Sequence, residues 1–239
     1  MRSVAVNHEM MIERLFPLLI AGDRGGVRSL FNEEQCASVA AEDLTKETYW
    51  PLLEMIQTMY RADQLTKLAY HYSTRLLRGL VDRAQLSYEI KKRRGRKMLM
   101  FSGPSEAEEL AGQMMADLAE ADGYEVYYGG GGIARDEIIA EVGSHRPDIL
   151  MMFGSSAQDA PGIREVIDTV REIATCPNLQ VVVGGGVFNR AEGLAAEIGA
   201  DLWAKDPVSL LVRLAAEPER RATPEQRTVG KTSGQSAAA

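Results

Sequence analysis

The chain has 239 residues, 45% of them hydrophobic, with a formal net charge of −7 and a pI near 5.2. This length and apolar content allow a sizeable core in one large or two small domains, and the acidic balance argues against general binding to nucleic-acid phosphates. No apolar run approaches the roughly 18 to 20 residues that span a bilayer, and the first residues lack a signal-peptide core. The two cysteines, Cys36 and Cys176, form neither a CxxC pair nor a disulfide framework. We therefore expect a soluble cytoplasmic protein.

The N-terminal third of the chain has the apolar spacing of amphipathic helices, from about residue 8 to 88. Asp23 is expected to cap a helix that runs toward Glu34, and Thr45 is expected to cap a helix from about 46 to 61. A long segment from about 64 to 87 completes the set. Four helices of this length predict a four-helix bundle, which we assign to residues 1–90 as a helical cap.

Beyond a basic linker at residues 91–97 (KKRRGRK), the hydrophobic period changes. Short apolar runs alternate with helical stretches in a β-α rhythm. The expected strands are 98–102, 124–128, 149–153, 180–183 and 202–204, and the expected helices are roughly 105–122, 133–145, 160–174, 190–198 and 207–216. Buried strands joined by single helices predict an α/β domain at 98–216, with a five-stranded parallel doubly wound sheet of the Rossmann-like or flavodoxin-like kind. The polar tail at 217–239 is predicted to be disordered.

Three loops at the ends of the predicted strands form the candidate binding site. They begin at Gly103 after the first strand, with Gly154-Ser155-Ser156 after the third and Gly184-Gly185-Gly186 after the fourth. Sheets of this kind bind ligands at the carboxyl ends of their strands, near the topological switch point. Glycines let a ligand approach the backbone, and serine hydroxyls donate and accept hydrogen bonds. We predict an elongated slot here, and the alternative is that the glycines only make tight turns.

The order of these segments resembles the cobalamin-binding family. The resemblance covers about residues 10–215 and rests on the helical cap, the basic linker, GYEV at 123–126, PDIL at 147–150 and VVVGGGVFNRAEGLAAEIGAD at 181–201. The family includes corrinoid carriers of methyltransferase systems and light-sensing repressors. It implies that the α/β domain accepts the nucleotide tail of a corrinoid and that the cap covers the upper face of the ring.

The chain departs from the family pattern in its first strand-end loop. That loop usually reads D-x-H-x-x-G, and its histidine ligates cobalt from below. Counting back from GYEV places Glu106 at the aspartate, Glu108 at the histidine and Ala111 at the glycine, and a one-residue slide places Glu109 at the histidine. Neither register supplies an imidazole, and carboxylates are harder, weaker donors. We expect cobalamin without a protein lower-ligand histidine, or haem, or another tetrapyrrole, or no ligand.

Two cap residues match the family's cap motif. Tyr60 stands where the family often has a tryptophan, and His71 stands on the histidine of a Glu-His pair, with Tyr70 in place of the glutamate. Imidazole is a common axial donor to cobalt or haem iron, so His71 is the candidate metal ligand. The alternative is an unliganded histidine on a helix surface. His8, in a fraying terminus, and His145, before a strand, are expected to be surface residues.

We expect the ligand to contact a set of cap and strand-end residues: Tyr60, Glu106, Glu108, Gly154, Ser155, Ser156, Gly184, Gly185 and Gly186. The leading hypothesis is a sensor or adaptor that holds a tetrapyrrole between cap and α/β domain and signals through a protein partner or self-association. The alternatives are a corrinoid methyl carrier, a haem-binding relative and a ligand-free interaction module. No GxxxxGK[ST], HExxH or GxSxG motif occurs, so we expect no catalysis except as the carrier subunit of a methyltransferase, and no direct nucleic-acid or membrane contact.

Overall fold

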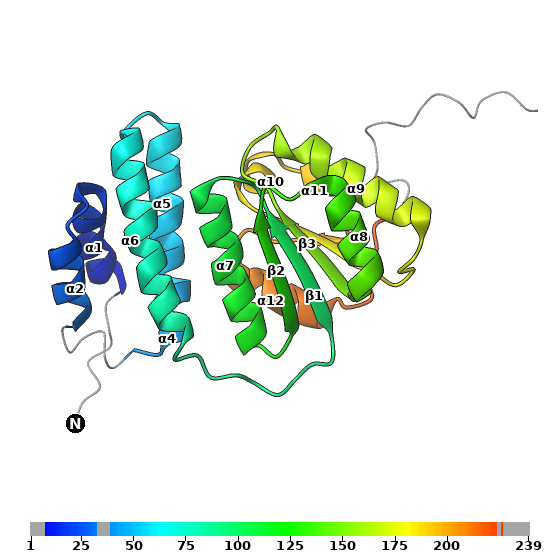
Figure 1. Ribbon diagram of the computed structural model, residues 1–239, viewed down its shortest axis with the longest axis horizontal. Helices are drawn as coiled ribbons and strands as arrows, with labels where there is room; N and C mark the ends of the chain where they lie inside the picture. Colours follow the sequence, from blue (N-terminus) through cyan, green and yellow to red (C-terminus); the bar gives the residue numbers. More distant parts are fainter. Residues whose placement is uncertain (1–7, 33–38, 224–225, 227–239) are drawn as a thin grey trace, which may run out of the picture. The chain divides into compact units, whose positions relative to one another are not determined.

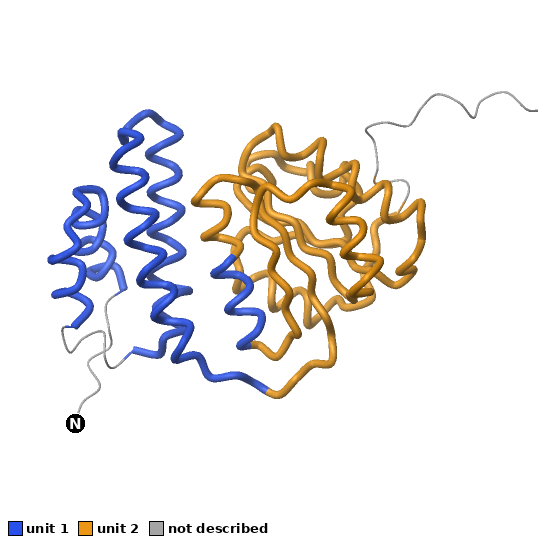
Figure 2. Tube along the Cα trace, in the orientation of Figure 1, with its two compact units in different colours: residues 1–91, 113–121 blue, residues 92–112, 122–239 orange. Residues whose placement is uncertain are grey.

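The computed structural model describes residues 8–32, 39–223 and 226 (Figure 1). The chain divides into two compact units (Figure 2). One comprises residues 1–91 with 113–121, and the other comprises residues 92–112 with 122–239. The division runs through helix α7 (Glu106–Ala121), whose second half groups with the N-terminal helices.

The N-terminal unit is helical, as predicted. Its described residues form α1 (His8–Ala21), α2 (Arg24–Asn32), a continuous run of α4 (Ala41–Leu44), a π-helical turn η1 (Thr45–Tyr49) and α5 (Trp50–Arg61), and finally α6 (Lys67–Gln85). Helix α1 packs against α2 and α6, and α5 packs against α6. Their shared apolar core contains Met11, Leu15, Leu19, Leu52, Leu53, Ile56 and Leu77. Burial of these apolar faces supplies most of the stability of such helices.

The predicted helix caps are confirmed at one end and wrong at another. The Asp23 carboxylate accepts a hydrogen bond from the Gly26 amide at 2.9 Å, as an N-cap does. The expected end of this helix near Glu34 lies outside the described residues. Thr45 does not begin a helix, because the helix starts at Ala41 and continues through it. Thr45 is fully buried, and its hydroxyl accepts a hydrogen bond from the Tyr88 hydroxyl at 2.6 Å, so it serves tertiary packing.

The second unit contains a five-stranded parallel sheet, which confirms the predicted fold class. Its strands are β1 (Lys97–Ser102), β2 (Glu125–Gly131), β3 (Ile149–Phe153), β4 (Gln180–Gly184) and β5 (Leu202–Trp203), in the order β2-β1-β3-β4-β5. The connecting helices are α7, α8 (Arg135–His145), α9 (Asp159–Ile173), α10 (Gly186–Arg190) and α11 (Leu194–Glu197), and α12 (Pro207–Ala216) follows β5. This is the flavodoxin-like order, and its switch point lies between β1 and β3.

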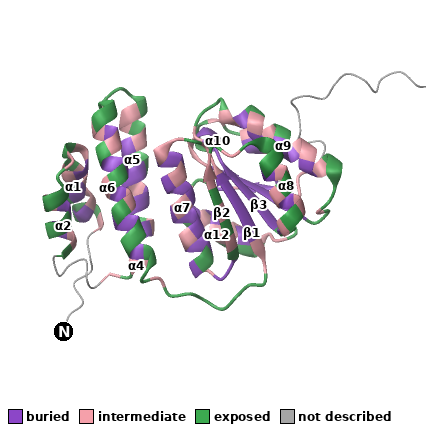
Figure 3. Ribbon diagram, in the orientation of Figure 1, coloured by how far each residue is buried: buried purple, intermediate pink, exposed green. Residues whose placement is uncertain are grey.

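The sheet is buried on both faces at its centre (Figure 3). Every residue of β3 and β4 is buried, which explains why both strands are continuous apolar runs in the sequence. On one face, residues such as Leu99, Leu150 and Val181 pack against α8 to α11. Alternation along the strands sends Met98, Met100 and Met151 to the other face, toward α7 and α12. Strand β2 is an edge strand, and its burial alternates.

Two element boundaries differ from the sequence prediction. Strand β2 runs on through the glycines to Gly131, because β2 carries one extra residue where Met100 to Ser102 of β1 pair with Tyr128 to Gly131. The single helix expected at 190–198 is two short helices, α10 and α11. The break falls at Ala191, whose backbone is extended with φ −112° and ψ 91°, and Gly193 with φ 83° precedes α11.

The tail also differs from the prediction at its start. Residues 217–223 are described and bonded to the sheet domain, where the buried Asp201 provides acceptors. The Ala222 amide donates to Asp201 Oδ1 at 2.6 Å, and Arg220 Nε donates to the Asp201 carbonyl oxygen at 3.0 Å. A polar composition therefore does not prevent order here, because a buried carboxylate requires donors. The rest of the tail, apart from residue 226, lies outside the described residues.

None of the helices within the described ranges is both long enough and apolar enough to cross a membrane.

We predict that Asp117→Asn makes the protein more stable at alkaline pH. Asp117 lies on α7, and its Oδ2 atom is buried without a hydrogen-bond partner among the described residues. Burial raises the pKa of Asp117 to about 7, and the charges of Glu120 and Asp82 add to this effect. Because the folded pKa lies above the unfolded one, stability is lost as pH rises through about 7.

The variant should gain on the order of 1 kcal/mol at pH 8, because it buries no charge there, and nothing at pH 4, where the Asp117 carboxyl is neutral in the folded protein. Urea unfolding across this pH range would measure the difference. The exposed Asp136→Asn on α8 is the control. An equal pH profile for the wild type and Asp117→Asn would contradict the prediction.

Candidate functional site

The glycine-rich loops after β3 and β4 meet at the carboxyl end of the sheet. The Gly154 amide donates a hydrogen bond to the Gly184 carbonyl oxygen at 3.0 Å. Gly185 has a φ of 103°, and a Cβ atom there would collide with the carbonyl oxygen of Gly154. Only glycine satisfies both conditions at this position. Gly186 lies one residue further, as the first residue of α10.

Glu108 is the residue that joins these loops to the first one. It is 6% exposed. Its carboxylate accepts a hydrogen bond from the Ser105 hydroxyl at 2.6 Å, and its amide donates a hydrogen bond to Ser105 Oγ at 3.3 Å. This pair forms a capping box at the start of α7. The other carboxylate oxygen accepts a hydrogen bond from the Ser155 amide at 2.8 Å. A single side chain therefore spans the switch point between β1 and β3.

A second carboxylate, that of Asp159, reaches the same amide. Asp159 Oδ2 accepts hydrogen bonds from the amides of Ser155 at 3.0 Å and Ser156 at 2.7 Å. Two carboxylates that share one N–H lie close together and repel each other when both are charged. Burial raises the pKa of Asp159, and the Glu108 charge adds to it. Burial also acts to raise the pKa of Glu108, but hydrogen bonds from Ser105 and Ser155 outweigh it and hold that pKa below its usual value. The two carboxylates therefore take up protons as an interacting pair when the pH falls.

Arg190 also contacts the loop after β3. It is the last residue of α10, and its guanidinium donates a hydrogen bond to the Ser155 carbonyl oxygen. Both backbone polar groups of Ser155 are thus held by charged side chains. The sequence prediction missed Asp159 and Arg190. An acidic residue in the first turn of a predicted helix was a usable signal for Asp159, whereas no local pattern marks Arg190.

The two remaining side chains predicted at the strand ends, Glu106 and Ser156, lie at the edge of the Glu108–Ser155 cluster. Glu106 is half-buried in the first turn of α7, two residues before Glu108. Ser156 is exposed, and its hydroxyl accepts a hydrogen bond from the Gln158 amide at 3.3 Å. The structure therefore brings Glu108, Ser155 and the glycine turns into one cluster, with Ser156 at its solvent-facing edge.

The two cap candidates lie beside one tyrosine in the helical unit. The ring of Tyr60, on α5, stacks on that of Tyr70, on α6, with centroids 4.2 Å apart and planes 17° apart. The His71 ring meets Tyr70 edge-on at 5.8 Å. Tyr60 and His71 are both half-buried. This cluster belongs to one unit and the strand-end loops belong to the other.

The other two histidines, which the sequence predicts to be surface residues, are both partly exposed. His8 begins α1, and its Nδ1 atom lies 2.9 Å from the Thr48 hydroxyl oxygen, so the helix end is tied down. His145 ends α8, is only partly exposed, and forms an ion pair with Glu141 at 2.8 Å. Each imidazole therefore has one polar neighbour, Thr48 for His8 and Glu141 for His145. Across residues 8–32 and 39–223, His, Cys, Asp and Glu form no group of three or more that could hold a metal ion.

Comparison with known proteins finds one family model and several similar solved structures. Residues 96–212 match the family model of the B12 binding domain. The structure of the monomethylamine corrinoid protein of Methanosarcina barkeri is similar with a TM-score of 0.76 and 15% identity, over 88% of this chain and 100% of that one. At this identity the likeness shows a shared fold.

Two further solved structures are more distant. A novel cobalamin-binding protein from Desulfitobacterium hafniense DCB-2 has a TM-score of 0.46 and 16% identity, over 87% of this chain and 98% of that one. The methanol:cobalamin methyltransferase complex from Methanosarcina barkeri has a TM-score of 0.48 and 12% identity, over 91% of this chain and 83% of that one. A search of curated proteins finds no match.

We predict that Glu108→Ala destabilises the protein by about 1–3 kcal/mol at pH 7, because it removes the capping box and one acceptor for the Ser155 amide. Glu108→Gln should lose less, since glutamine also completes a capping box. The folded pKa of Glu108 is lowered, so its contribution is present above the unfolded pKa and disappears as pH falls through the folded one.

Chemical unfolding at pH 7 and pH 3 would measure both effects. Glu109→Ala, in the same helical turn, is the matched control for the charge near the helix N-terminus. If Glu108→Ala loses no more stability than Glu109→Ala, the bridge across the switch point contributes nothing.

Proposed function

We propose that this chain, whose residues 96–212 belong to the B12 binding domain family, holds a cobalamin or a related corrinoid at the carboxyl ends of β1, β3 and β4. The family match carries this proposal. It includes all five strands of the sheet and all three strand-end loops. In a flavodoxin-like sheet these loops surround the switch point, where ligands of this fold class bind.

The glycine turns fit the tail of such a ligand. Gly154 and Gly185 approach each other at backbone distance, so no side chain of theirs obstructs the space above β3 and β4. The Ser155 and Ser156 hydroxyls offer donors and acceptors for the polar parts of a nucleotide tail. Glu108 is the obstacle, since its carboxylate joins the loops after β1 and β3. Entry of the tail requires this bridge to open.

The corrinoid would be held without a lower ligand from the protein. Neither register of the family motif supplies a histidine. In the register counted back from GYEV, Glu108 stands at that position, and its carboxylate is already engaged by Ser105 and Ser155. A bound corrinoid supplies a cobalt ion that takes axial ligands, and imidazole is a better donor to it than carboxylate. The protein's contribution on this side is therefore the slot for the tail.

On the other side of the ring we propose the cap residues His71 and Tyr60. His71 would supply an axial nitrogen, and Tyr60, already stacked on Tyr70, would offer an aromatic surface to the macrocycle. This assignment follows the family resemblance of the cap motif. It requires the cap to lie over the strand-end loops in the ligand-bound protein.

Two roles are compatible with such a site. The first is a sensor or adaptor, in which ligand binding changes how the cap and the sheet domain sit and a protein partner or a second copy detects the change. The second is a corrinoid methyl carrier that works with a methyltransferase. The fold likeness to a monomethylamine corrinoid protein, over that protein's whole length, favours the second. The engaged carboxylate of Glu108 in place of the family histidine favours the first.

We predict that Ser156→Trp weakens hydroxocobalamin binding at least about tenfold, which is about 1.4 kcal/mol. The indole would occupy the rim of the slot, and the Ser156 amide would keep its hydrogen bond to Asp159. Gly185→Trp is a poorer test, because its φ of 103° strains any other residue. Titration followed by the visible spectrum measures the affinity.

Ser144→Trp, an equally exposed serine near the end of α8, is the matched control and should bind like the wild type. Equal affinities for the two tryptophan variants would count against a slot at the strand ends. Absence of binding by the wild-type protein would refute the proposed function itself.

We predict that His71→Ala changes the visible spectrum of the bound cofactor, because it removes the axial nitrogen. Titrations with hydroxocobalamin and with haemin distinguish the ligands, since the one that depends on His71 loses its band shift in the variant. His145→Ala on α8 is the control and should leave the spectrum unchanged. An unchanged spectrum of bound ligand in His71→Ala would remove His71 as the axial ligand.

A further inference from the structure

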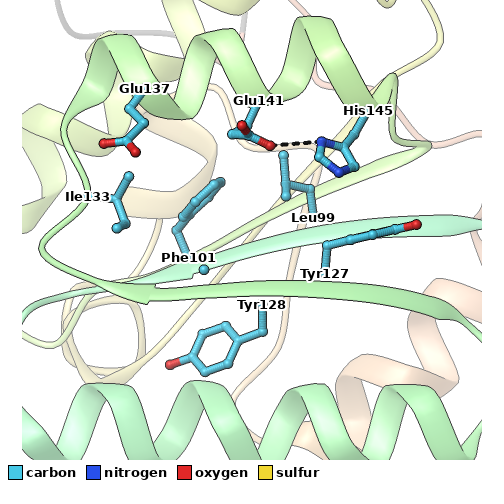
Figure 4. Close-up of a pocket in the computed structure, with 9 residues that line it drawn as sticks. Leu99, Phe101, Tyr127, Tyr128, Ile133, Glu137, Glu141 and His145 are labelled. Atoms are coloured by element: carbon cyan, nitrogen blue, oxygen red, sulfur yellow. Dashed lines mark ion pairs between the residues drawn. The ribbon is translucent and has the colours of Figure 1, made fainter.

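A pocket lies away from the strand-end loops, between the sheet and α8. Its volume is about 300 Å³, at the small end for ligand pockets (Figure 4). Its walls come from β1, β2, the loop after β2 and α8. The lining residues are Leu99, Phe101, Tyr127, Tyr128, Gly129, Ile133, Glu137, Glu141 and His145. None of them belongs to the strand-end cluster around Ser155.

The floor of this pocket is apolar and aromatic. Leu99 and Phe101 point from β1 toward α8, and Ile133 stands at one end of the pocket (Figure 4). Gly129 allows this arrangement, since a Cβ atom there would lie 2.6 Å from Cε1 of Phe101. Tyr127, on the edge strand, is 38% exposed and leaves part of its ring for a ligand. Such a floor suits the hydrocarbon part of a small molecule.

The wall formed by α8 carries the charge. Glu137, Glu141 and His145 are spaced four residues apart and line the pocket from one face of the helix (Figure 4). Glu141 forms an ion pair with His145 at 2.8 Å. Glu137 has no ion-pair or hydrogen-bond partner within the described part of the chain. An anionic group is therefore available beside an apolar floor.

One cation near the pocket is already engaged. Lys97 Nζ donates a hydrogen bond to the His145 carbonyl oxygen at 3.0 Å and lies 5.9 Å from the Tyr127 ring centre. The His145 ring lies 4.7 Å from the same ring. These contacts fix the Tyr127 ring at the end of the pocket near His145. Glu137, toward the other end of α8, remains without a counter-ion among the described residues.

We propose that this pocket binds a small organic ammonium ion with an aromatic or aliphatic body. The body would lie on Leu99, Phe101 and Ile133, and the ammonium group would pair with Glu137. Aromatic faces add to the attraction for a cation. The carboxylates of Glu137 and Glu141 repel a carboxylate ligand of the same shape. The choice of a cation therefore follows from an unpaired carboxylate beside an apolar cavity of limited size.

The experiment compares three probes of nearly equal shape on the full chain: 2-phenylethylammonium, neutral 2-phenylethanol and anionic 3-phenylpropionate. Calorimetry gives the affinities, and amide shifts in nuclear magnetic resonance spectra locate the site. We expect the ammonium to bind at least about threefold more tightly than the alcohol, a difference typical of one partly exposed charge pair. The carboxylate should bind most weakly. The shifts should fall on Gly129, Ile133 and α8.

Variants of the protein distinguish the contribution of the Glu137 charge to binding from that of the apolar cavity. Glu137→Gln should bring the ammonium affinity down to that of the alcohol, while Asp136→Asn, the exposed neighbour on α8 that does not line the pocket, should leave it unchanged. Ile133→Trp should fill the pocket and abolish binding of both. Glu137 is exposed, so its variant should fold. The proposal is overturned if the ammonium does not bind, if the three probes bind equally, if Glu137→Gln behaves like Asp136→Asn, or if the shifts map elsewhere.

Discussion

The amide of Ser155 is the point on which the strand-end architecture depends. Two carboxylates from different helices, Glu108 on α7 and Asp159 on α9, accept hydrogen bonds from this one N–H group. Arg190 donates a hydrogen bond to the Ser155 carbonyl oxygen. A parallel sheet brings the carboxyl ends of β1 and β3 side by side, but it leaves their loops free to differ. The buried Glu108 side chain removes that freedom by tying the two loops together. The relative position of the two loops therefore follows from this interaction as much as from the sheet.

The same interaction sets the energetics of ligand entry. Opening the bridge costs about 1–3 kcal/mol if the Ser155 amide and the Glu108 carboxylate lose each other as partners. Asp159 reduces this cost, because it already shares the amide. The hydrogen bonds and buried apolar area of a bound corrinoid tail must offset the remaining free-energy cost of opening the bridge. While its carboxylate is engaged by Ser105 and Ser155, Glu108 therefore opposes entry of the proposed ligand between the two loops.

The sequence predicted the buried elements well and the tertiary contacts poorly. Strand β3 matches its expected range because a continuous apolar run has one interpretation in a β-α sequence. The Ser105-x-x-Glu108 spacing was a readable capping box, but the reach of Glu108 to Ser155 depends on β1 pairing with β3, which no local pattern contains. Thr45 was predicted as a helix cap, since a threonine before a helical run usually caps the helix. In the structure its hydroxyl instead accepts a hydrogen bond from Tyr88, 43 residues later. Long-range partners decided each such difference.

The edge strand β2 presents two neighbouring tyrosines to opposite faces of the sheet. Tyr127 points to the pocket beside α8, while the next residue, Tyr128, points to the opposite face (Figure 4) and donates a hydrogen bond to the Glu109 carbonyl oxygen at 2.8 Å. A slip of one residue would turn each side chain of the strand to the opposite face. The register shift that follows, between Met100 and Ser102 of β1, lies beyond this pair. The irregularity therefore falls where the strand meets the loops, and it leaves the alternation that serves each face intact.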